Sequence, residues 1–378
     1  MTAATKKRLF LFILKNGPVH NIADHIEGQV SALSLYFDCE VWAPGSIDSD
    51  DRKGEAGSRI RIVRTPEFGG LKSRLPYLLR LVARAVTLRF IRPRKVCVLV
   101  QDPLKGGLIG VLAKWLSGGS LVVEVNGTYA SEENYIDNLD SAAAKKKIEQ
   151  IRRLSEFVLR HADGVRALYD GQMEGLGKVP EWAQFRVFFD LAATSRFHDL
   201  GDTSTVLFVG YPFYRKGVDL LIQAFEKICD AFPGWRLQLI GHDLEGEARK
   251  FIRGDRVDVM KAMSNEALVE YIGKCGIFVL PSRSEAMGRV LLEAGAAAKP
   301  RLAADVDGIH TVIANGVDGL LFKKENINEL AEKLSALMAS AELRKRLGTL
   351  ARARVNAEFS SQLYAAKMKE IIEASVRN

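Results

Sequence analysis

The chain has 378 residues, of which 47% are apolar, and a formal net charge of +8. This length and apolar content allow two cores of ordinary domain size and exclude an intrinsically disordered protein. No apolar run is long enough to span a membrane, and residues 9–14 are too short for a signal peptide and lack a cleavage site, so we expect a soluble or peripheral protein.

Cysteine and histidine usage argues against a disulfide framework and a metal site. Four cysteines occur in or beside apolar runs without paired spacing, at Cys39, Cys97, Cys229 and Cys275. This pattern is typical of reduced core thiols in a cytoplasmic protein. His20, Asp24 and His25 are a loop histidine and a helix face, and the six His of the chain form no second cluster. We predict no metal.

In the first half of the chain, apolar strands alternate with helical or loop stretches. Strands are predicted at residues 9–14, 40–43, 59–63, 96–100, 121–125, 163–168 and 186–190, and helices at 22–36, 75–92 and 141–161. A repeating strand and helix pattern predicts a doubly wound parallel sheet. Residues 191–204, rich in Ala, Thr, Ser and Asp, follow as a candidate hinge.

The second half repeats this pattern. Strands are predicted at residues 205–210, 237–240, 257–260, 277–280, 301–304 and 319–322, and helices at 218–229, from about 288, and at 326–338, 341–355 and 362–374. The consequence is a second doubly wound sheet.

Residues 278–304 carry the most functional information. A short apolar run ends at Pro281 and passes through a polar loop into a helix that begins near Gly288. In an open α/β sheet such a helix start faces the crevice at the carboxyl ends of the strands. A phosphate could therefore accept hydrogen bonds from the N–H groups of Gly288, Arg289 and Val290.

Two carboxylates flank this anion site, Glu285 before the helix and Glu293 within it. Because carboxylates only accept hydrogen bonds, hydroxyls are their natural partners, and a sugar at Glu285 with a ribose diol at Glu293 would suit a nucleotide-sugar. The alternative is a solvated loop residue and an exposed helix residue. Lys216, at the mouth of the loop before the helix at 218–229, would neutralise charge on a departing diphosphate.

Residues 284–293 resemble the E-x7-E segment of the family 4 retaining glycosyltransferases, which have the GT-B fold. Further segments are similar to that family at Lys299-Pro300, 307–309 and 315–322. The resemblance covers the C-terminal half well and the N-terminal half loosely. It implies two Rossmann-like domains facing across a cleft, with residues 1–190 on the acceptor side, 205–355 binding the nucleotide-sugar, and a last helix within 356–378 crossing back to the first domain.

The resemblance also implies site residues. Gly17 would correspond to a Gly-rich loop near the donor, and residues 260–264 to the main-chain groups that contact the base. Asn126 stands where the family has His; it can hydrogen-bond a hydroxyl but cannot take a proton, and a plain Asn-Gly turn is the alternative. Tyr211 replaces the Arg that the family pairs with the equivalent of Lys216. Arg215 or Arg289 could reach the same phosphates, or be solvated.

The implied activity is transfer of a sugar, with retention, from a UDP- or GDP-sugar to a hydroxyl acceptor, without a metal. A lipid-linked or oligosaccharide acceptor of cell-surface polysaccharide, lipopolysaccharide or glycolipid synthesis is expected. The alternatives are a phosphorylase or nucleotide-sugar epimerase on the same fold, and a non-catalytic nucleotide-sugar-binding protein.

Residues 59–95 contain eleven Lys or Arg and one acid, Glu67. The helix at 75–92 is a crossover helix or part of a basic face that Lys72, Arg74, Arg92, Arg94 and Lys95 extend. Nucleic acid is disfavoured because no aromatic interleaving or recognition motif is present. An anionic membrane suits the charge better and would place the protein at the inner face of the cytoplasmic membrane.

Overall fold

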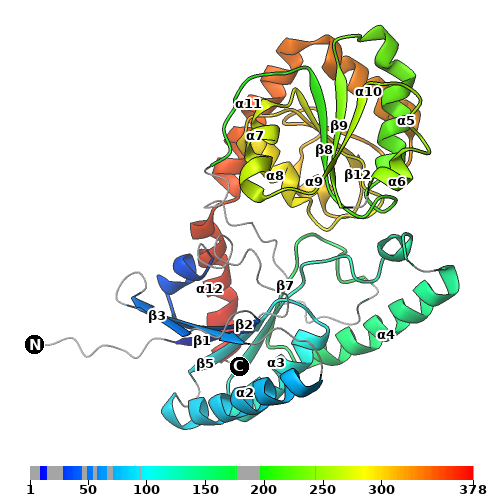
Figure 1. Ribbon diagram of the computed structural model, residues 1–378. Helices are drawn as coiled ribbons and strands as arrows, with labels where there is room; N and C mark the ends of the chain where they lie inside the picture. The colour runs from blue at the N-terminus through cyan, green and yellow to red at the C-terminus, as the bar shows by residue number, and fades with distance from the viewer. Residues whose placement is uncertain are drawn as a thin grey trace, which may run out of the picture. The chain divides into compact units, whose positions relative to one another are not determined.

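Short strands alternate with helices along the chain and assemble into two sheets (Figure 1). The computed structural model describes residues 9–14, 29–44, 49–53, 58–65, 71–92, 95–138, 140–174, 176, 196–242 and 244–377. Contacts divide the chain into a first unit, Met1–Gly127, Glu149–Ala193 and Ser360–Asn378, and a second unit, Thr128–Ile148 and Thr194–Phe359.

The first unit contains a sheet in the order β3-β4-β2-β1-β5-β6-β7. Its strands are β1 (Phe10–Leu14), β2 (Asp38–Pro44), β3 (Ser49–Lys53), β4 (Arg59–Thr65), β5 (Val96–Val100), β6 (Ser120–Glu124) and β7 (Gly164–Arg166). All pairs are parallel except β3 with β4. The predicted parallel sheet is confirmed. Strand β3 was not predicted because its sequence, SDDRK, contains no apolar residue, as suits a charged edge strand.

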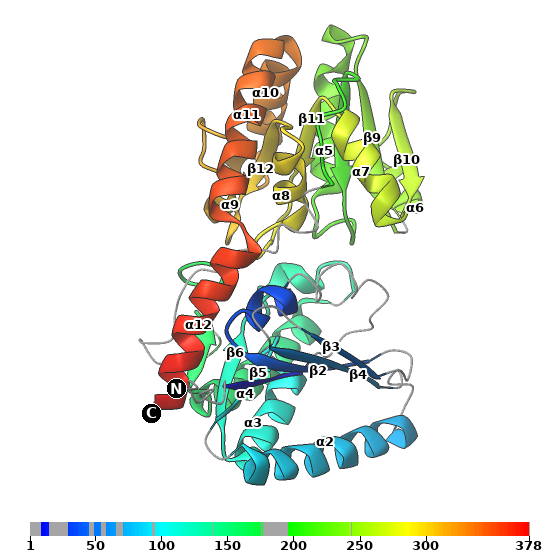
Figure 2. The same cartoon turned by 90° about the vertical axis from the view of Figure 1, so that its left-hand side faces the viewer.

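The described helices of the first unit are residues 29–34, α2 (Leu71–Ile91), α3 (Lys105–Ser117), most of α4 (Ser141–Arg160) and α12 (Ser361–Arg377). The last helix packs against β5, β6 and β7 (Figure 2). Tyr364, Met368 and Ile372 on this helix are buried in one core with Leu11 and Ile13 of β1. The final residues of the chain therefore complete the core of the first sheet.

The second unit contains an all-parallel sheet in the order β10-β9-β8-β11-β12-β13. Its strands are β8 (Thr205–Val209), β9 (Arg236–Gly241), β10 (Val257–Lys261), β11 (Ile277–Leu280), β12 (Arg301–Asp305) and β13 (Leu320–Lys323). Its helices are α5 (Val218–Ile228), α6 (Glu245–Ala248), α7 (Asn265–Lys274), α8 (Arg289–Ala296), α9 (Ile309–Val312), α10 (Ile327–Ala339) and α11 (Ala341–Glu358), with short 3-10 turns at Glu132–Tyr135 and Cys229–Ala231.

Strand order in the second sheet reverses between β8 and β11. From β8 the chain proceeds to β9 and β10 on one side, and from β11 to β12 and β13 on the other. Parallel α/β sheets bind ligands at the carboxyl ends of the two strands that flank such a reversal. The loops after β8 and β11, which carry Lys216 and Glu285, both begin there.

Some predicted features lie outside the described residues. These are Gly17, the start of the helix at 22–36, the strand at 186–190, and residues 191–195 of the candidate hinge. Among the described residues, no helix is both long enough and apolar enough to cross a membrane.

All four cysteines are buried and free. Burial raises the pKa of Cys39, Cys97 and Cys275 to about 12 and also raises the pKa of Cys229.

Because the thiolate is the nucleophile, we expect iodoacetamide at about pH 8 to label none of the four thiols in the folded protein and all four after unfolding in guanidinium. Mass spectrometry counts the labels. Rapid labelling of Cys97 in the folded protein would contradict this burial.

Candidate active site

The loop after β11 leads into α8 at Gly288, where any other residue would strain the backbone. Gly288 has φ 69° and is the N-cap of the helix. A Cβ at this position would lie 3.0 Å from side-chain atoms of Leu280, Leu291 and Ile309. The first intrahelical bond runs from the N–H of Leu291 to the carbonyl of Gly288, at 2.8 Å. The N–H groups of Gly288 to Val290 therefore lie at the start of the helix, which begins where the sequence predicts.

The loop after β8 makes close contact with the loop after β11. Gly217 has φ 67°, and a Cβ there would lie 2.0 Å from the carbonyl oxygen of Pro281, so only glycine permits this approach. Lys216 and Glu285 form an ion pair, and each side chain is 13% exposed. The two residues predicted for the diphosphate and the sugar therefore lie together at the reversal of strand order.

Glu285 is positioned by Asp307. One carboxylate oxygen of Asp307 accepts from the Glu285 backbone N–H and from the Ser284 hydroxyl, both at 2.9 Å. The hydroxyls of Ser284 and Thr128 also lie 2.9 Å apart. Asp307, in the segment that resembles the family's G-G-x-x-E motif, therefore holds the backbone of Glu285 in place.

Glu293 lies one turn inside α8 and pairs with Arg289 at 2.9 Å. Its side chain is 12% exposed, so it is not the exposed helix residue of the alternative interpretation. Burial raises the pKa of Glu293, and the charge of Arg289 opposes that rise. Arg289, a candidate phosphate ligand, is thus engaged with Glu293 in this structure.

Arg283 is a buried arginine that sequence analysis did not single out. Its guanidinium donates two hydrogen bonds of 2.8 Å to the carboxylate of Asp219 in α5 and one of 2.8 Å to Glu325 after β13. It also donates to the carbonyl of Tyr214, while its backbone N–H donates to the carbonyl of Arg215. Arg283 therefore fixes the loop before Lys216. No sequence pattern marks this role, because Asp219 and Arg283 lie 64 residues apart.

A segment that lies between β6 and β7 in the chain also contacts the Lys216 loop. Asp137 accepts hydrogen bonds from the backbone N–H of Tyr214 at 2.7 Å and of Arg215 at 2.9 Å. Residues 128–148 belong to the second unit, although the chain enters them from β6 of the first sheet. One carboxylate thus holds two consecutive amides directly before Lys216.

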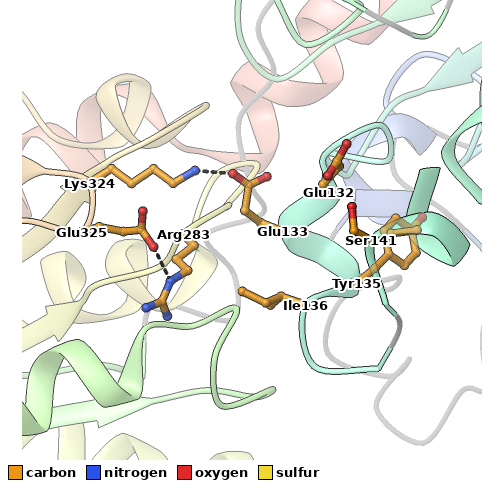
Figure 3. Close-up of a pocket in the computed structure, with 9 residues that line it drawn as sticks. Glu132, Glu133, Tyr135, Ile136, Ser141, Arg283, Lys324 and Glu325 are labelled. Atoms are coloured by element: carbon orange, nitrogen blue, oxygen red, sulfur yellow. Dashed lines mark hydrogen bonds and ion pairs between the residues drawn. The ribbon is translucent and has the colours of Figure 1, made fainter.

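A pocket of about 360 Å³ lies beside Arg283 in the second unit (Figure 3). One side carries Arg283, Lys324 and Glu325, and the other carries Glu132, Glu133, Tyr135, Ile136 and Ser141. Ala144 also lines the pocket. The ion pair of Lys324 with Glu133 joins the two sides. Its lining contains both hydrogen-bond donors and acceptors, together with Tyr135 and Ile136.

The remaining predicted site residues make local contacts. In the first unit, Asn126 donates to the carbonyl of Gln101 at 3.1 Å and accepts from Arg166 at 2.6 Å, so both ends of its amide are hydrogen-bonded. In the second unit, Tyr211 is 49% exposed and packs edge-on against His242. The Arg215 guanidinium donates to the carbonyl of Tyr211 at 3.3 Å.

The segment at 315–322 is a structural turn. Asn315 accepts from the N–H of Leu321 and Asp318 from the N–H of Ala314, both at 2.9 Å. Asp318 also pairs with Arg301 at 3.1 Å; Arg301 is fully buried, and burial lowers its pKa to about 10. This family-like segment therefore anchors β13.

We expect Asp219→Asn to lower the free energy of unfolding by about 3 to 5 kcal/mol, because it leaves the Arg283 charge buried without its main partner. The Asp219 side chain is only 8% exposed. Glu325→Gln is the matched control: it removes the other carboxylate on the same guanidinium, but Glu325 is 56% exposed, and we expect a loss below about 1 kcal/mol. Urea unfolding followed by circular dichroism measures both. Equal losses would contradict the assigned role of Asp219.

Comparison with known proteins identifies relatives of both halves. Residues 194–354 match the family described as glycosyl transferases group 1. The chain is 28% identical over 323 residues to D-inositol 3-phosphate glycosyltransferase of Kribbella flavida, covering 78% of this chain and 76% of that protein. It is 28% identical over 170 residues to the capsular polysaccharide biosynthesis glycosyltransferase CapM of Staphylococcus aureus, covering 43% and 44%.

A third relative, an uncharacterized glycosyltransferase of Methanocaldococcus jannaschii, is 36% identical over 155 residues, and the chain spans only 42% of its length. Among solved structures, sucrose-phosphate synthase of Thermosynechococcus elongatus superposes with a TM-score of 0.74 at 18% identity, covering 96% of this chain and 98% of that one. HepE of Anabaena, solved with UDP and glucose, has a TM-score of 0.69 at 15% identity, covering 97% and 100%. Residues 194–354 therefore belong to the group 1 glycosyl transferases by their family match, and the chain has the two-domain GT-B fold.

Proposed function

We propose that the protein transfers a sugar from a UDP- or GDP-sugar to a hydroxyl acceptor, with retention at the anomeric carbon and without a metal. The observation that carries this proposal is the Lys216–Glu285 ion pair at the reversal of strand order, next to the first turn of α8. A cation and the N-terminus of a helix suit a diphosphate, and a carboxylate beside them suits a hydroxylated sugar. The complex of Anabaena HepE with UDP and glucose supports this class of donor.

Each residue has a distinct proposed role. Lys216 moves from Glu285 to the diphosphate when the donor binds, and the amides of Gly288, Arg289 and Val290 bind the same phosphates. Glu285 then accepts from hydroxyls of the sugar, and Glu293 accepts from the ribose diol. Asn126 is proposed as a third catalytic residue beside Glu285 and Lys216, and Gly17 and Arg215 are proposed as further contacts of the donor.

The proposed reaction breaks the bond between the anomeric carbon and the diphosphate oxygen and forms a bond from that carbon to the acceptor oxygen on the same face. The acceptor proton leaves with the diphosphate. Negative charge grows on the departing diphosphate, and Lys216 stabilises it in a partly buried site where a fixed charge acts strongly. This is why the Lys216 charge matters more in the transition state than in the bound donor.

For the acceptor, we propose a lipid-linked or oligosaccharide hydroxyl in cell-surface polysaccharide, lipopolysaccharide or glycolipid synthesis, used at the inner face of the cytoplasmic membrane. The similarity to CapM, whose name assigns it to capsular polysaccharide biosynthesis, supports this choice. The pocket beside Arg283 offers an uncharged hydroxylated ring both donors and acceptors.

We expect Lys216→Ala and Glu293→Gln each to lower kcat/KM by two to three decades, that is about 2 to 4 kcal/mol of transition-state stabilisation. The donor is the UDP- or GDP-sugar that gives the largest thermal shift, and release of nucleoside diphosphate measures turnover. Lys250→Ala, which removes a lysine that is 60% exposed on the same unit, is the control and should match the wild type. Wild-type kinetics in Lys216→Ala would remove the proposed role of this lysine.

Retention is tested separately by the configuration of the product. We expect proton NMR of the first product formed to show the same anomer as the donor. An inverted product would disprove the retaining mechanism while leaving the nucleotide-sugar site in place. Turnover of the donor to an epimer without acceptor, or a requirement for inorganic phosphate, would replace transfer by epimerase or phosphorylase activity.

A further inference from the structure

Two neighbouring helices of the first unit, α2 and α3, expose a large share of the apolar side chains that the fold leaves in solvent (Figure 1). Of the fourteen large hydrophobic side chains exposed within the described residues, eight lie on these helices. They are Leu75, Leu79, Val86, Phe90, Ile91, Leu108, Leu112 and Trp115, which we call the apolar face. Scattered exposed apolar residues are normal, but a contiguous set marks an interaction surface.

Helical spacing places most of these side chains on one side of each helix, and Ile91 is the exception on α2. Leu75, Leu79, Val86 and Phe90 share one side of α2, and Phe90 is 77% exposed. The opposite side of α2 is the buried one, with Tyr77, Leu81, Ala85 and Leu88 in the core. The fold of the first unit therefore uses one side of this helix and leaves a second apolar side without a partner among the described residues.

The two helices are also strictly basic. Together α2 and α3 contain seven Lys or Arg and no Asp or Glu. The Arg89 guanidinium on α2 donates to the carbonyl of Trp115 on α3 at 3.3 Å. This hydrogen bond places a cation of α2 beside the part of the apolar face that α3 carries. Arg80, Arg89 and Lys105 are exposed in the described chain. The charge at the apolar face thus has one sign.

Not all of the predicted basic face is available to a partner. Arg84 pairs with the buried Glu40 at 2.6 Å, and Arg92 pairs with Asp38 at 2.8 Å. Both acids belong to β2, so these two arginines hold α2 to the sheet. The eleven basic residues in residues 59–95 therefore overstate the charge that is available to a partner. The surface offers a partner apolar side chains as well as the remaining charge.

We propose that the apolar face inserts into the headgroup region of an anionic membrane, with Arg80, Arg89 and Lys105 contacting lipid phosphates around it. A helix with one solvent-facing apolar side and flanking cations has the composition of a segment that lies in a membrane interface. Trp115 suits the same depth, because its ring is apolar and its indole N–H is polar. The proposal rests on the proposed function in one respect: a lipid-linked acceptor would be presented at this surface.

The test is flotation of the full chain with vesicles of phosphatidylcholine alone and with roughly one third phosphatidylglycerol. We expect binding to the anionic vesicles that weakens, but persists in part, as salt rises, because insertion of apolar side chains is not screened. The combined variant Leu79→Ser, Phe90→Ser, Trp115→Ser should bind at least tenfold more weakly. Arg80→Gln with Arg89→Gln should bind more weakly and show a smaller salt dependence, because Lys105 remains.

Leu350→Ser, which removes an apolar residue that is 40% exposed on α11 of the second unit, is the matched control and should bind like the wild type. Because all substituted side chains are exposed, the midpoint temperature of thermal unfolding should be the same in these variants as in the wild type. Undiminished vesicle binding by the combined variant, or no binding by the wild type, overturns the proposal. So does a wild-type dimer in sedimentation that the combined variant dissociates, since the apolar face would then cover a second copy.

This experiment is independent of catalysis. The thermal shift with UDP-glucose or another donor tests the proposed function on the same variants, and we expect it to be unchanged by the combined substitution. Donor binding without vesicle binding would remove the membrane surface alone. Vesicle binding without any donor binding would remove the proposed function and leave the surface.

Discussion

The candidate site depends on the buried ion pair of Arg283 with Asp219. The two side chains are about one-tenth exposed, and their bidentate pairing holds the guanidinium in one orientation. In this orientation the guanidinium also donates to the carbonyl of Tyr214 and to the carboxylate of Glu325. Gly217, pressed against Pro281, and Asp137, which holds the amides of Tyr214 and Arg215, act on the same loop. These three contacts fix the backbone directly before and after Lys216. A fixed position of the charge is the preorganisation that electrostatic catalysis requires.

This constraint changes how the departures from the family pattern should be understood. Tyr211 replaces a family arginine, yet the chain places Lys216 against Glu285 without it. Arg215 lies within the same loop but donates to the carbonyl of Tyr211, and Arg289 pairs with Glu293. A second cation at the diphosphate would therefore have to exchange one of these partners. The energetic cost of that exchange, rather than the absence of any nearby arginine, is the consequence of Tyr211.

Sequence analysis predicted what depends on local pattern. The strands at 96–100 and 277–280 have the bounds of β5 and β11, and α8 begins beside Gly288, because apolar runs and glycine positions determine these features. Arg283 could not be predicted, since its partners come from α5 and from the end of β13. The association of residues 128–148 with the second unit could not be predicted either. Asp137 and Thr128 make polar contacts, and such contacts produce no periodic pattern of apolar residues in the sequence. Long-range hydrogen bonds have no signature in a single sequence.

The same limit applies to charge. Eleven basic residues in residues 59–95 predict a uniformly positive surface, but β2 supplies two acids, Asp38 and Glu40, that lie distant in sequence and adjacent in space. An arginine paired with a carboxylate that is 1% exposed, as Arg84 is, holds a helix to its sheet and contributes little to the external field. What distinguishes α2 from an ordinary crossover helix is therefore its second apolar side. Since burying one side already satisfies the fold, the other side of α2 requires a separate explanation. Because α2 and α3 carry no acid, the proposed anionic lipid surface would provide one.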